Sequence, residues 1–496
     1  MQPKFLNLFL FLLLASITLS SFAFGQYGGG SAPAAASAVA MATVAVATDS
    51  DLPTTEPDPP PASGPEPSYP GIGPTKAKLE GTLGPLKVRF YGTLLLNISA
   101  SDSAEVGEEV PLWAVPGSVL VTFPDGGSRR AGEIHDTIFT ARQSILGFTL
   151  SPASTSEDHW NPSALLEFDF FGSRPVDTVQ PQARVFNQPR LRLGYFQLEK
   201  GAWKILAGQD HAIVAPLDPV SLSHVSVPLG ATAGNLWGWM PQVRVEHTHH
   251  FGNTSALLQL GVLRPQFADP RFSAAGVPGG SDLPTPGTAI DSSPGLGERA
   301  SHPFYQARVA VSHPRGDSTA TIGAAAHYGR ERIGARRTLD SWAFALDWSV
   351  PFYWRLMFRG ESFVGSNLVP FQGGILQGVA ILQPVATAPP RQINRIGAGG
   401  GWAELIVPAT ADNKNIFYFG VGTDDPRDRQ LLQGTGRSKN SMGWASYFRK
   451  LTSEVTLAFE WSDWQFRTRN FVGGLPAGRG ATGRGNVFNL ALAYQF

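Results

Sequence analysis

Residues 486–496, NVFNLALAYQF, end the chain and decide its fold. From position 488 every second residue is large and apolar or aromatic, and the residues between are small or polar. The large residues are Phe488, Leu490, Leu492, Tyr494 and Phe496. A period of two predicts a β-strand with one apolar face. Soluble chains usually end in a mobile polar tail, so an aromatic last residue raises the question of what its apolar face contacts.

Segments with the same alternation recur from Leu86 onwards, and sixteen of them can be recognised. In 341–349, for example, Trp342, Phe344, Leu346 and Trp348 share one face, and Asp347 lies on the other. A large apolar face opposite a charged face is the pattern of a transmembrane barrel, with lipid outside and water inside. One such strand also fits a soluble sandwich whose polar face is the outer one. Sixteen in succession favour the barrel.

The connections between these segments alternate in length. Short ones include 199–202, 249–253, 313–317, 350–351 and 450–452, and long ones include 99–136, 173–186, 211–238, 265–303, 364–399 and 424–440. Short periplasmic turns that alternate with long outer loops are typical of outer-membrane barrels. The predicted fold is therefore an all-β transmembrane antiparallel β-barrel of sixteen strands over 85–496, in the outer membrane of a diderm bacterium, with both of its ends on the periplasmic side.

The start of the chain predicts export. Lys4 precedes an apolar run from Phe5 to about Leu19, and small residues follow, as in a secretory signal peptide over 1–23. A retained anchor is the alternative, but the run is short for a spanning helix. Residues 24–84 are rich first in Ala and then in Pro, which predicts a disordered periplasmic linker. The chain has no Cys, so an exported protein of this size needs a large core or a closed sheet.

Several segments resemble, in order, the DcaP-like family of outer-membrane porins. They are TARQSILGFTL (140–150), ALLEFDFFG (164–172), PRLRLGYFQLEKGAWKILAGQD (189–210), MPQVRVEHT (240–248), GGWAEL (400–405) and YFGVGTDDP (418–426). The resemblance implies a homotrimeric sixteen-stranded porin that passes small, often anionic solutes such as dicarboxylates. The Ala/Pro linker replaces the family's coiled-coil region, and Ile145 stands where the family has a basic residue. Phosphate-selective porins are a nearby alternative.

The last strand has a second expected role. A terminal strand that ends in Phe496, with apolar residues at alternating positions before it, resembles the C-terminal signal read by the barrel assembly machinery. This strand must pair with the first one, because an open sheet edge cannot stand in lipid. The pairing would also explain why no polar tail follows.

A diffusion porin needs a water-filled lumen, a constriction and an electric field at that constriction. It needs no catalytic residue, metal or cofactor, and none is expected. Three of the 39 bases and six of the 39 acids precede residue 85, which leaves 36 bases and 33 acids in the barrel. This excess of three bases predicts a mild preference for anionic solutes. The balanced charge of the whole chain does not point to nucleic acid.

The third long connection, 211–238, is unusually apolar for a surface loop, which predicts that it folds into the lumen and narrows it. Arg190 and Arg192 on one strand and Arg355 and Arg359 on another are expected to form a basic ladder opposite this loop. The alternative is that these arginines pair with acids of the wall and only hold the barrel. The candidate pore-lining residues are Arg89, Arg190, Arg192, Lys204, Asp210, His211, Asp218, His224, Arg244, Arg308, Arg355, Arg359 and Glu361.

Other motifs give weaker hypotheses. HTHH (247–250) could bind a metal, but no cysteine or carboxylate cluster joins it, so a solvated turn is preferred. Ser223 and His224 lack the sequence context of a hydrolase. The glycine-rich stretch 472–485 is expected to be an outer loop, since it lacks the residues of a phosphate-binding loop. A barrel enzyme and a structural barrel with a plugged lumen stay open as alternatives to the porin.

Overall fold

A computed structural model of the chain describes residues 79–496, apart from 108, 157, 173–187, 268–294, 317, 335, 353–354 and 383–389. The predicted signal peptide, 1–23, and residues 24–78 of the predicted linker lie outside the described residues. No helix within the described ranges is long and apolar enough to cross a membrane.

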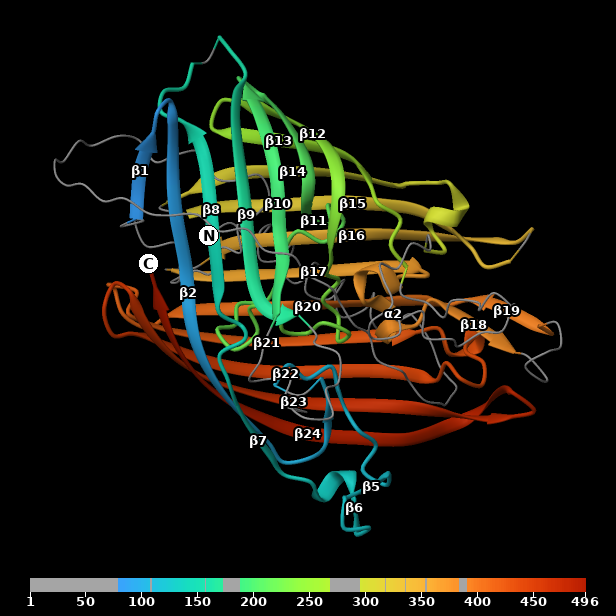
Figure 1. The fold of residues 1–496 in the computed structure, drawn as a ribbon. Coiled ribbons are helices and arrows are strands. Elements are labelled where there is room, and N and C mark those ends of the chain that lie inside the picture. Colours follow the sequence, from blue (N-terminus) through green and yellow to red (C-terminus); the bar gives the residue numbers. More distant parts are fainter. Residues whose placement is uncertain are drawn as a thin grey trace, which may run out of the picture.

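Sixteen antiparallel strands close into a barrel, as the sequence predicts (Figure 1). Each strand pairs with the next one along the chain, and the last pairs with the first. The wall consists of β2 (Leu86–Ser101), β8 (Ile145–Pro152), β9 (Asn161–Gly172), β10 (Gln188–Lys200), β11 (Trp203–His211), β12 (Trp239–Phe251), β13 (Thr254–Leu263), β14 (Phe304–Arg315), β15 (Ser318–Arg332), β16 (Thr338–Phe352), β17 (Leu356–Ser366), β20 (Gly397–Pro408), β21 (Asn415–Pro426), β22 (Arg437–Lys450), β23 (Val455–Val472) and β24 (Leu475–Gln495).

Short elements lie in the connections and at the edges of the wall. They are β1 (Leu79–Leu83), β3 (Glu105–Val106), β4 (Trp113–Ala114), β5 (Leu120–Thr122), β6 (Ser128–Arg130), β7 (Asp136–Thr140), β18 (Val379–Leu382), β19 (Gln392–Arg395), the helical turn α2 (Gly373–Leu376) and the 3-10 turns Ala131–Glu133, Glu298–Ala300, Val369–Phe371 and Asp428–Gln430. Most of them belong to the long connections at one end of the barrel.

The barrel closes along β2, which is long enough to pair with two strands in succession on each edge. On one edge β24 pairs with Thr93–Ser101, and β1 pairs with Leu86–Phe90. The main chains of Phe496 and Gly92 exchange two hydrogen bonds, of 3.1 and 3.2 Å, between these two stretches. The sheet therefore includes β1, which lies inside the range predicted as linker. The predicted closure of the last strand on the first is confirmed.

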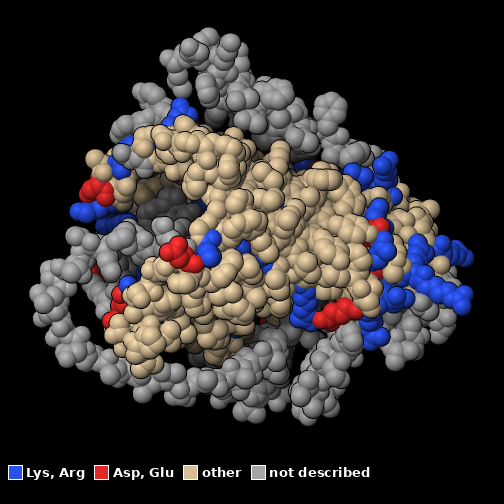
Figure 2. All heavy atoms as spheres, turned by 90° about the horizontal axis from the view of Figure 1, so that it is seen from above, with Lys and Arg blue, Asp and Glu red and all other residues tan. Residues whose placement is uncertain are grey.

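The outer face of the wall is apolar. On β16, Phe344 and Leu346 are 61% and 46% exposed, whereas Asp347 of the same strand is 3% exposed. In Figure 2, residues other than Lys, Arg, Asp and Glu cover most of the middle of the visible face, and charged side chains gather towards its two ends. A closed barrel with an apolar outer band is the architecture of outer-membrane proteins. The predicted fold and membrane location are confirmed.

The short connections are tight hairpin turns, as predicted. Gly201 and Gly252 have φ of +54° and +58°, the conformation that two-residue hairpins need and that glycine adopts without strain. The alternation in length is less regular than predicted. At the end with the long connections, β15 joins β16 through 333–337, and β23 joins β24 through 473–474. The stretch 472–485, predicted as a loop, is therefore mostly the start of β24.

Candidate functional site

The segment between β11 and β12, residues 212–238, runs inside the barrel, and we call it the internal connection. Its main chain is hydrogen-bonded to side chains from opposite parts of the wall, and most of its residues are buried. Its apolar side chains Val220, Leu222 and Val225 pack in one cluster with wall residues that include Tyr418 and Phe448. A second cluster joins Leu229 and Ala233 to Trp402, Trp444 and Trp464 of β20, β22 and β23.

Side-chain acceptors of β14, β17 and β20 bind main-chain N–H groups of the internal connection. The N–H of Leu217 donates to Glu361 at 2.7 Å, and that of Val220 donates to both oxygens of Glu404 at 3.1 and 3.3 Å. Gln306 accepts hydrogen bonds from the N–H groups of Ile213 and Val214 at 2.6 and 3.1 Å. Buried N–H groups need such partners, because leaving one unpaired costs about 1–3 kcal/mol.

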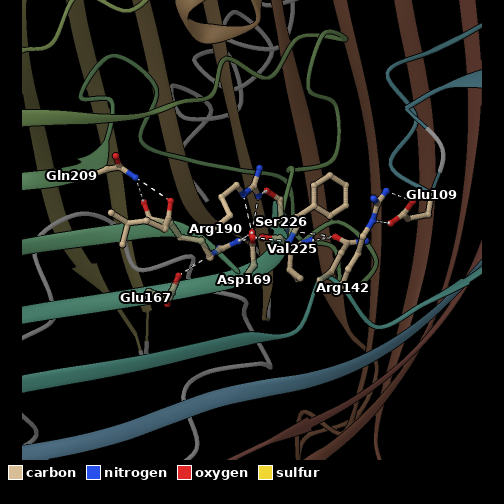
Figure 3. A network of polar contacts seen from close by, with 12 residues as sticks. Glu109, Arg142, Glu167, Asp169, Arg190, Gln209, Val225 and Ser226 are labelled. Carbon is tan, nitrogen blue, oxygen red and sulfur yellow. Dashed lines mark hydrogen bonds and ion pairs between the residues drawn. The ribbon is translucent and has the colours of Figure 1, made fainter. Parts of the chain in front are cut away.

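On the side of β8–β10, side chains of the wall mostly donate hydrogen bonds to carbonyl groups of the internal connection (Figure 3). Arg190 donates to the carbonyl of Ser226 at 2.6 Å, and Arg192 donates to that of Val225 at 2.7 Å. Gln143 donates to the carbonyl of Ser223 at 2.7 Å and accepts from the N–H groups of Val225 and Ser226 at 3.1 and 3.2 Å. One glutamine thus makes three bonds to the same turn.

The same arginines pair with acids of the neighbouring strand. Arg190 contacts Asp169 at 2.6 Å, and Arg192 contacts Glu167 at 2.7 Å. Both guanidinium groups also lie over the Trp239 ring, at 5.0 and 4.7 Å. Figure 3 shows Arg190 between Asp169 of the wall and Ser226 of the internal connection. Both arginines join the wall to the internal connection, and their charge is offset by the acids of β9.

Three further arginines of the inner wall, Arg244, Arg308 and Arg359, are ion-paired and buried. Arg244 contacts Asp210 at 2.7 Å and Glu246 at 2.6 Å. Arg308 contacts Asp347 at 2.7 Å, and Arg359 lies 3.9 Å from Glu404. The side chains of Arg244 and Arg359 are 2% and 5% exposed. The sequence left open whether such bases form a basic ladder or pair with acids of the wall. The contacts of these three arginines match pairing with acids of the wall.

The remaining candidate residues occupy different places. Lys204 lies between Glu199 and Glu246, at 3.5 and 3.4 Å. His211 lies 3.4 Å from Asp210, and Asn235 donates to Asp218 at 2.8 Å. Arg89 lies on β2 in register with Glu80 of β1.

Arg355 is not part of a ladder with Arg359. It lies in the turn before β17 and donates to the carbonyl of Thr410 at 3.0 Å, across to the turn between β20 and β21. The parity of one unbroken strand over 352–363 predicted that Arg355 faces inwards. The chain turns before Leu356, so this parity does not extend to Arg355, and the proposed ladder is wrong at this residue.

His224 lies in the internal connection and contacts the far wall. Its Nδ1 is 2.8 Å from Glu460 of β23 and 3.1 Å from the hydroxyl of Ser221. A catalytic relay needs the acid and the serine on different ring nitrogens, and here both contact Nδ1. The arrangement fits a structural contact that holds the internal connection to β23.

The histidines of 247–250 belong to the end of β12, not to a turn. The His247 ring is tilted against that of Trp203 with centroids 4.3 Å apart, and His249 contacts Phe251 edge-on at the same distance. Among the described residues, no group of three or more His, Cys, Asp or Glu side chains could hold a metal ion.

Sequence reasoning missed Gln143 and Gln306 as residues that hold the internal connection. Both contacts are to main-chain groups, which carry no side-chain pattern. The sequence offers only a general indication, which is that a glutamine side chain buried inside the barrel needs hydrogen-bond partners.

The fold and the inner wall together define an outer-membrane β-barrel with an internal connection. No model of a protein family matches the chain, and neither does any curated protein. The crystal structure of the outer membrane channel DcaP of Acinetobacter baumannii has a similar fold, with a TM-score of 0.55 at 12% identity over 83% of this chain and 97% of that chain. An anion-selective porin from Comamonas acidovorans gives a TM-score of 0.45 at 12% identity over 83% of this chain and 100% of that chain.

At this identity the likeness to DcaP shows a shared barrel fold. The predicted resemblance is confirmed at that level.

Proposed function

We propose that this barrel is a porin through which small hydrophilic solutes diffuse. The observation that supports it is the inner wall, which carries charged side chains in a barrel whose outer face is apolar. On β10 and β11 the side chains of Arg190 and Lys204 are 26% and 19% exposed, whereas Arg359 and Glu404 on the opposite wall are 5% and 0% exposed. The solute path therefore passes the partly exposed side chains of Arg190 and Lys204 on the side of β10 and β11.

We further propose a mild preference for anions such as small carboxylates, and a homotrimeric assembly. The preference rests on the excess of three bases in the barrel and on the partly exposed Arg190 and Lys204 along the proposed path. Because most wall bases are paired with acids, the field in the path is weak. The expected selectivity is accordingly small, and phosphate and dicarboxylates are both candidate solutes.

Planar-bilayer recording of the refolded protein under a salt gradient tests this function. Stepwise currents in groups of three, with a reversal potential that favours anions, are the expected result. Lys204→Gln should shift the reversal potential towards cations, because Lys204 lies on the proposed path. Arg355→Gln is the matched control, since this residue lies in a turn, and it should leave the reversal potential unchanged. Equal shifts in both variants would contradict the proposed path.

A closed structural barrel is the second candidate. It is favoured by the two apolar clusters that join the internal connection to β20–β24. The bilayer experiment separates the two functions, because a barrel that is folded by gel mobility but conducts no current would be closed. Blocking of the chloride current by added succinate or phosphate would in turn identify the solute class of an open one.

A further inference from the structure

Arg89 of β2 belongs to the inner face of the barrel wall. On this strand Leu94 is 51% exposed, whereas Leu95 is 2% exposed. The pairing of β2 with β8 and with β24 has no register shift, so the alternation of side chains continues to the start of the strand. Odd-numbered residues of β2 therefore face inwards, and Tyr91 accordingly donates to Glu167 of β9 at 2.9 Å.

Arg89 lies between the internal connection and the end of the barrel with the short connections. The internal connection contacts β2 at Asn97, which donates to the carbonyl of Ser223 at 3.3 Å, and at Leu95, which belongs to the same apolar cluster as Val220. Arg89 precedes Leu95 by six residues, which is about 20 Å along a strand at roughly 3.3 Å per residue. This first part of β2 lies beside β1, at the end of the barrel opposite β5 and β6 (Figure 1). A solute that crosses the barrel therefore passes the level of Arg89 as well as that of the internal connection.

The guanidinium group of Arg89 has no ion pair and no hydrogen bond with any residue that the structure describes. Its Nε is buried and still lacks an acceptor within the described ranges. The other strand bases among the candidate pore-lining residues all contact acids, namely Arg190, Arg192, Lys204, Arg244, Arg308 and Arg359. Arg89 is thus the exception in a wall whose bases are otherwise paired.

Two acids on nearby positions of the sheet contact other bases. Glu80 lies opposite Arg89 in the pairing of β1 with β2, but it contacts Lys87 at 2.7 Å. Glu167 of β9 contacts Arg192 at 2.7 Å. Lys87, Arg89 and Glu80 together carry one net positive charge at the start of β2. This charge differs from those of the paired bases, because the field of a base is largely cancelled by an acid in contact with it.

We propose that Arg89 is the residue that determines the preference of the barrel for anionic solutes. This inference rests on the proposed porin function and assigns its selectivity to one side chain. A single fixed charge in a narrow aqueous path lowers the energy of a passing anion and raises that of a cation. The selectivity is then set at the end of the barrel with the short connections, and the paired arginines that hold the internal connection contribute little to it.

The test measures the ratio of chloride to potassium permeability of the full-length refolded protein in a planar bilayer, from the reversal potential under a potassium chloride gradient. Arg89→Gln should lower this ratio roughly twofold, as expected for one unit charge about 8 Å from the passing ion at ~0.1 M salt. Arg89→Glu changes the charge by two units and should lower the ratio about fourfold. Arg89→Lys keeps the charge and should keep the ratio of the wild type. Only conducting channels are recorded, so a variant with a low folding yield still gives a ratio.

Arg449→Gln is the matched control. Arg449 lies on the outer face of β22 near the same end of the barrel, where it donates to Asn415 at 2.6 Å, and its replacement should leave the permeability ratio unchanged. An unchanged ratio in Arg89→Gln, or equal ratios in Arg89→Gln and Arg89→Lys, would overturn the role of this charge and leave the porin function standing. A folded wild type that conducts no current would overturn the porin function and this inference with it.

Discussion

Replacing Gln143 by Ala should release the internal connection from the wall near β8. Gln143 makes three hydrogen bonds to it, at 2.7, 3.1 and 3.2 Å, and all three are buried. At about 1 kcal/mol for each bond, their loss weakens the attachment by about 3 kcal/mol. Ser223 keeps the bond that Asn97 donates to its carbonyl at 3.3 Å, so the connection stays inside the barrel on average. The ratio of released to attached states should rise by roughly a hundredfold.

Single-channel recording measures this change directly. The wild type should give a steady open current, and Gln143→Ala should add rapid fluctuations and a higher mean conductance as the released segment moves. Gln433→Ala, an exposed glutamine between β21 and β22, removes the same side-chain volume away from the lumen and serves as the control. Identical current noise in the two variants and the wild type would refute the role of Gln143 in holding the connection.

Three further predictions concern stability and assembly. Glu460→Gln removes the charge from the 2.8 Å contact with His224 and should destabilise the barrel by about 2 kcal/mol. The folded band on a gel should then disappear at a lower temperature than in the wild type, and an unchanged temperature would contradict this. Burial raises the pKa of the Glu105 carboxyl from 4.5 to about 8, so the folded state holds a proton in that range that the unfolded chain has released. The free energy of unfolding should therefore fall as pH rises from 4.5 to 8, and Glu105→Gln should remove this part of the slope; parallel pH profiles would argue against it. Deleting Phe496 removes its two bonds to Gly92 and should lower the amount of folded barrel in outer-membrane fractions, whereas an equal yield would show that these bonds are dispensable.

The fold could be predicted from the sequence because side chains of the wall strands alternate between lipid and the barrel interior with a period of two residues. The parity that placed Phe344 outside and Asp347 inside holds across the wall, since lipid and the interior select opposite side chains on alternate positions. The same reasoning failed where the period was interrupted. Parity predicts an inward face for Arg355 only if one strand runs through the turn before Leu356, and the many glycines of 472–485 predict a loop where β24 begins. The main chain of 475–485 still pairs with β23, because hydrogen bonds between strands do not depend on large side chains.

The sequence could predict which residues of the candidate site face inwards, but not what each of them contacts. Parity identified Arg190, Arg192 and Arg359 as residues of the inner wall. The contact of Arg190 with Ser226 and the burial of Arg192 and Arg359 show that they face inwards. Whether such a base faces water or binds a main-chain carbonyl depends on where 212–238 runs, and its sequence shows only that it is apolar. The contacts of Gln143 follow from that path and from no local pattern.

The first and the last strand of the described residues pair with the same edge of β2. Phe496 pairs with Gly92 and Leu79 pairs with Phe90, so β24 and β1 lie end to end on this edge and run in the same direction. A short peptide link from Phe496 to Leu79 would make one continuous strand of the two. The polypeptide could then be opened at the turn 252–253 to give a circular permutant with the same wall and no terminus at β2. Such a permutant keeps the pairing of Phe496 with Gly92, which closes the barrel, and moves the free ends of the polypeptide to another part of the wall.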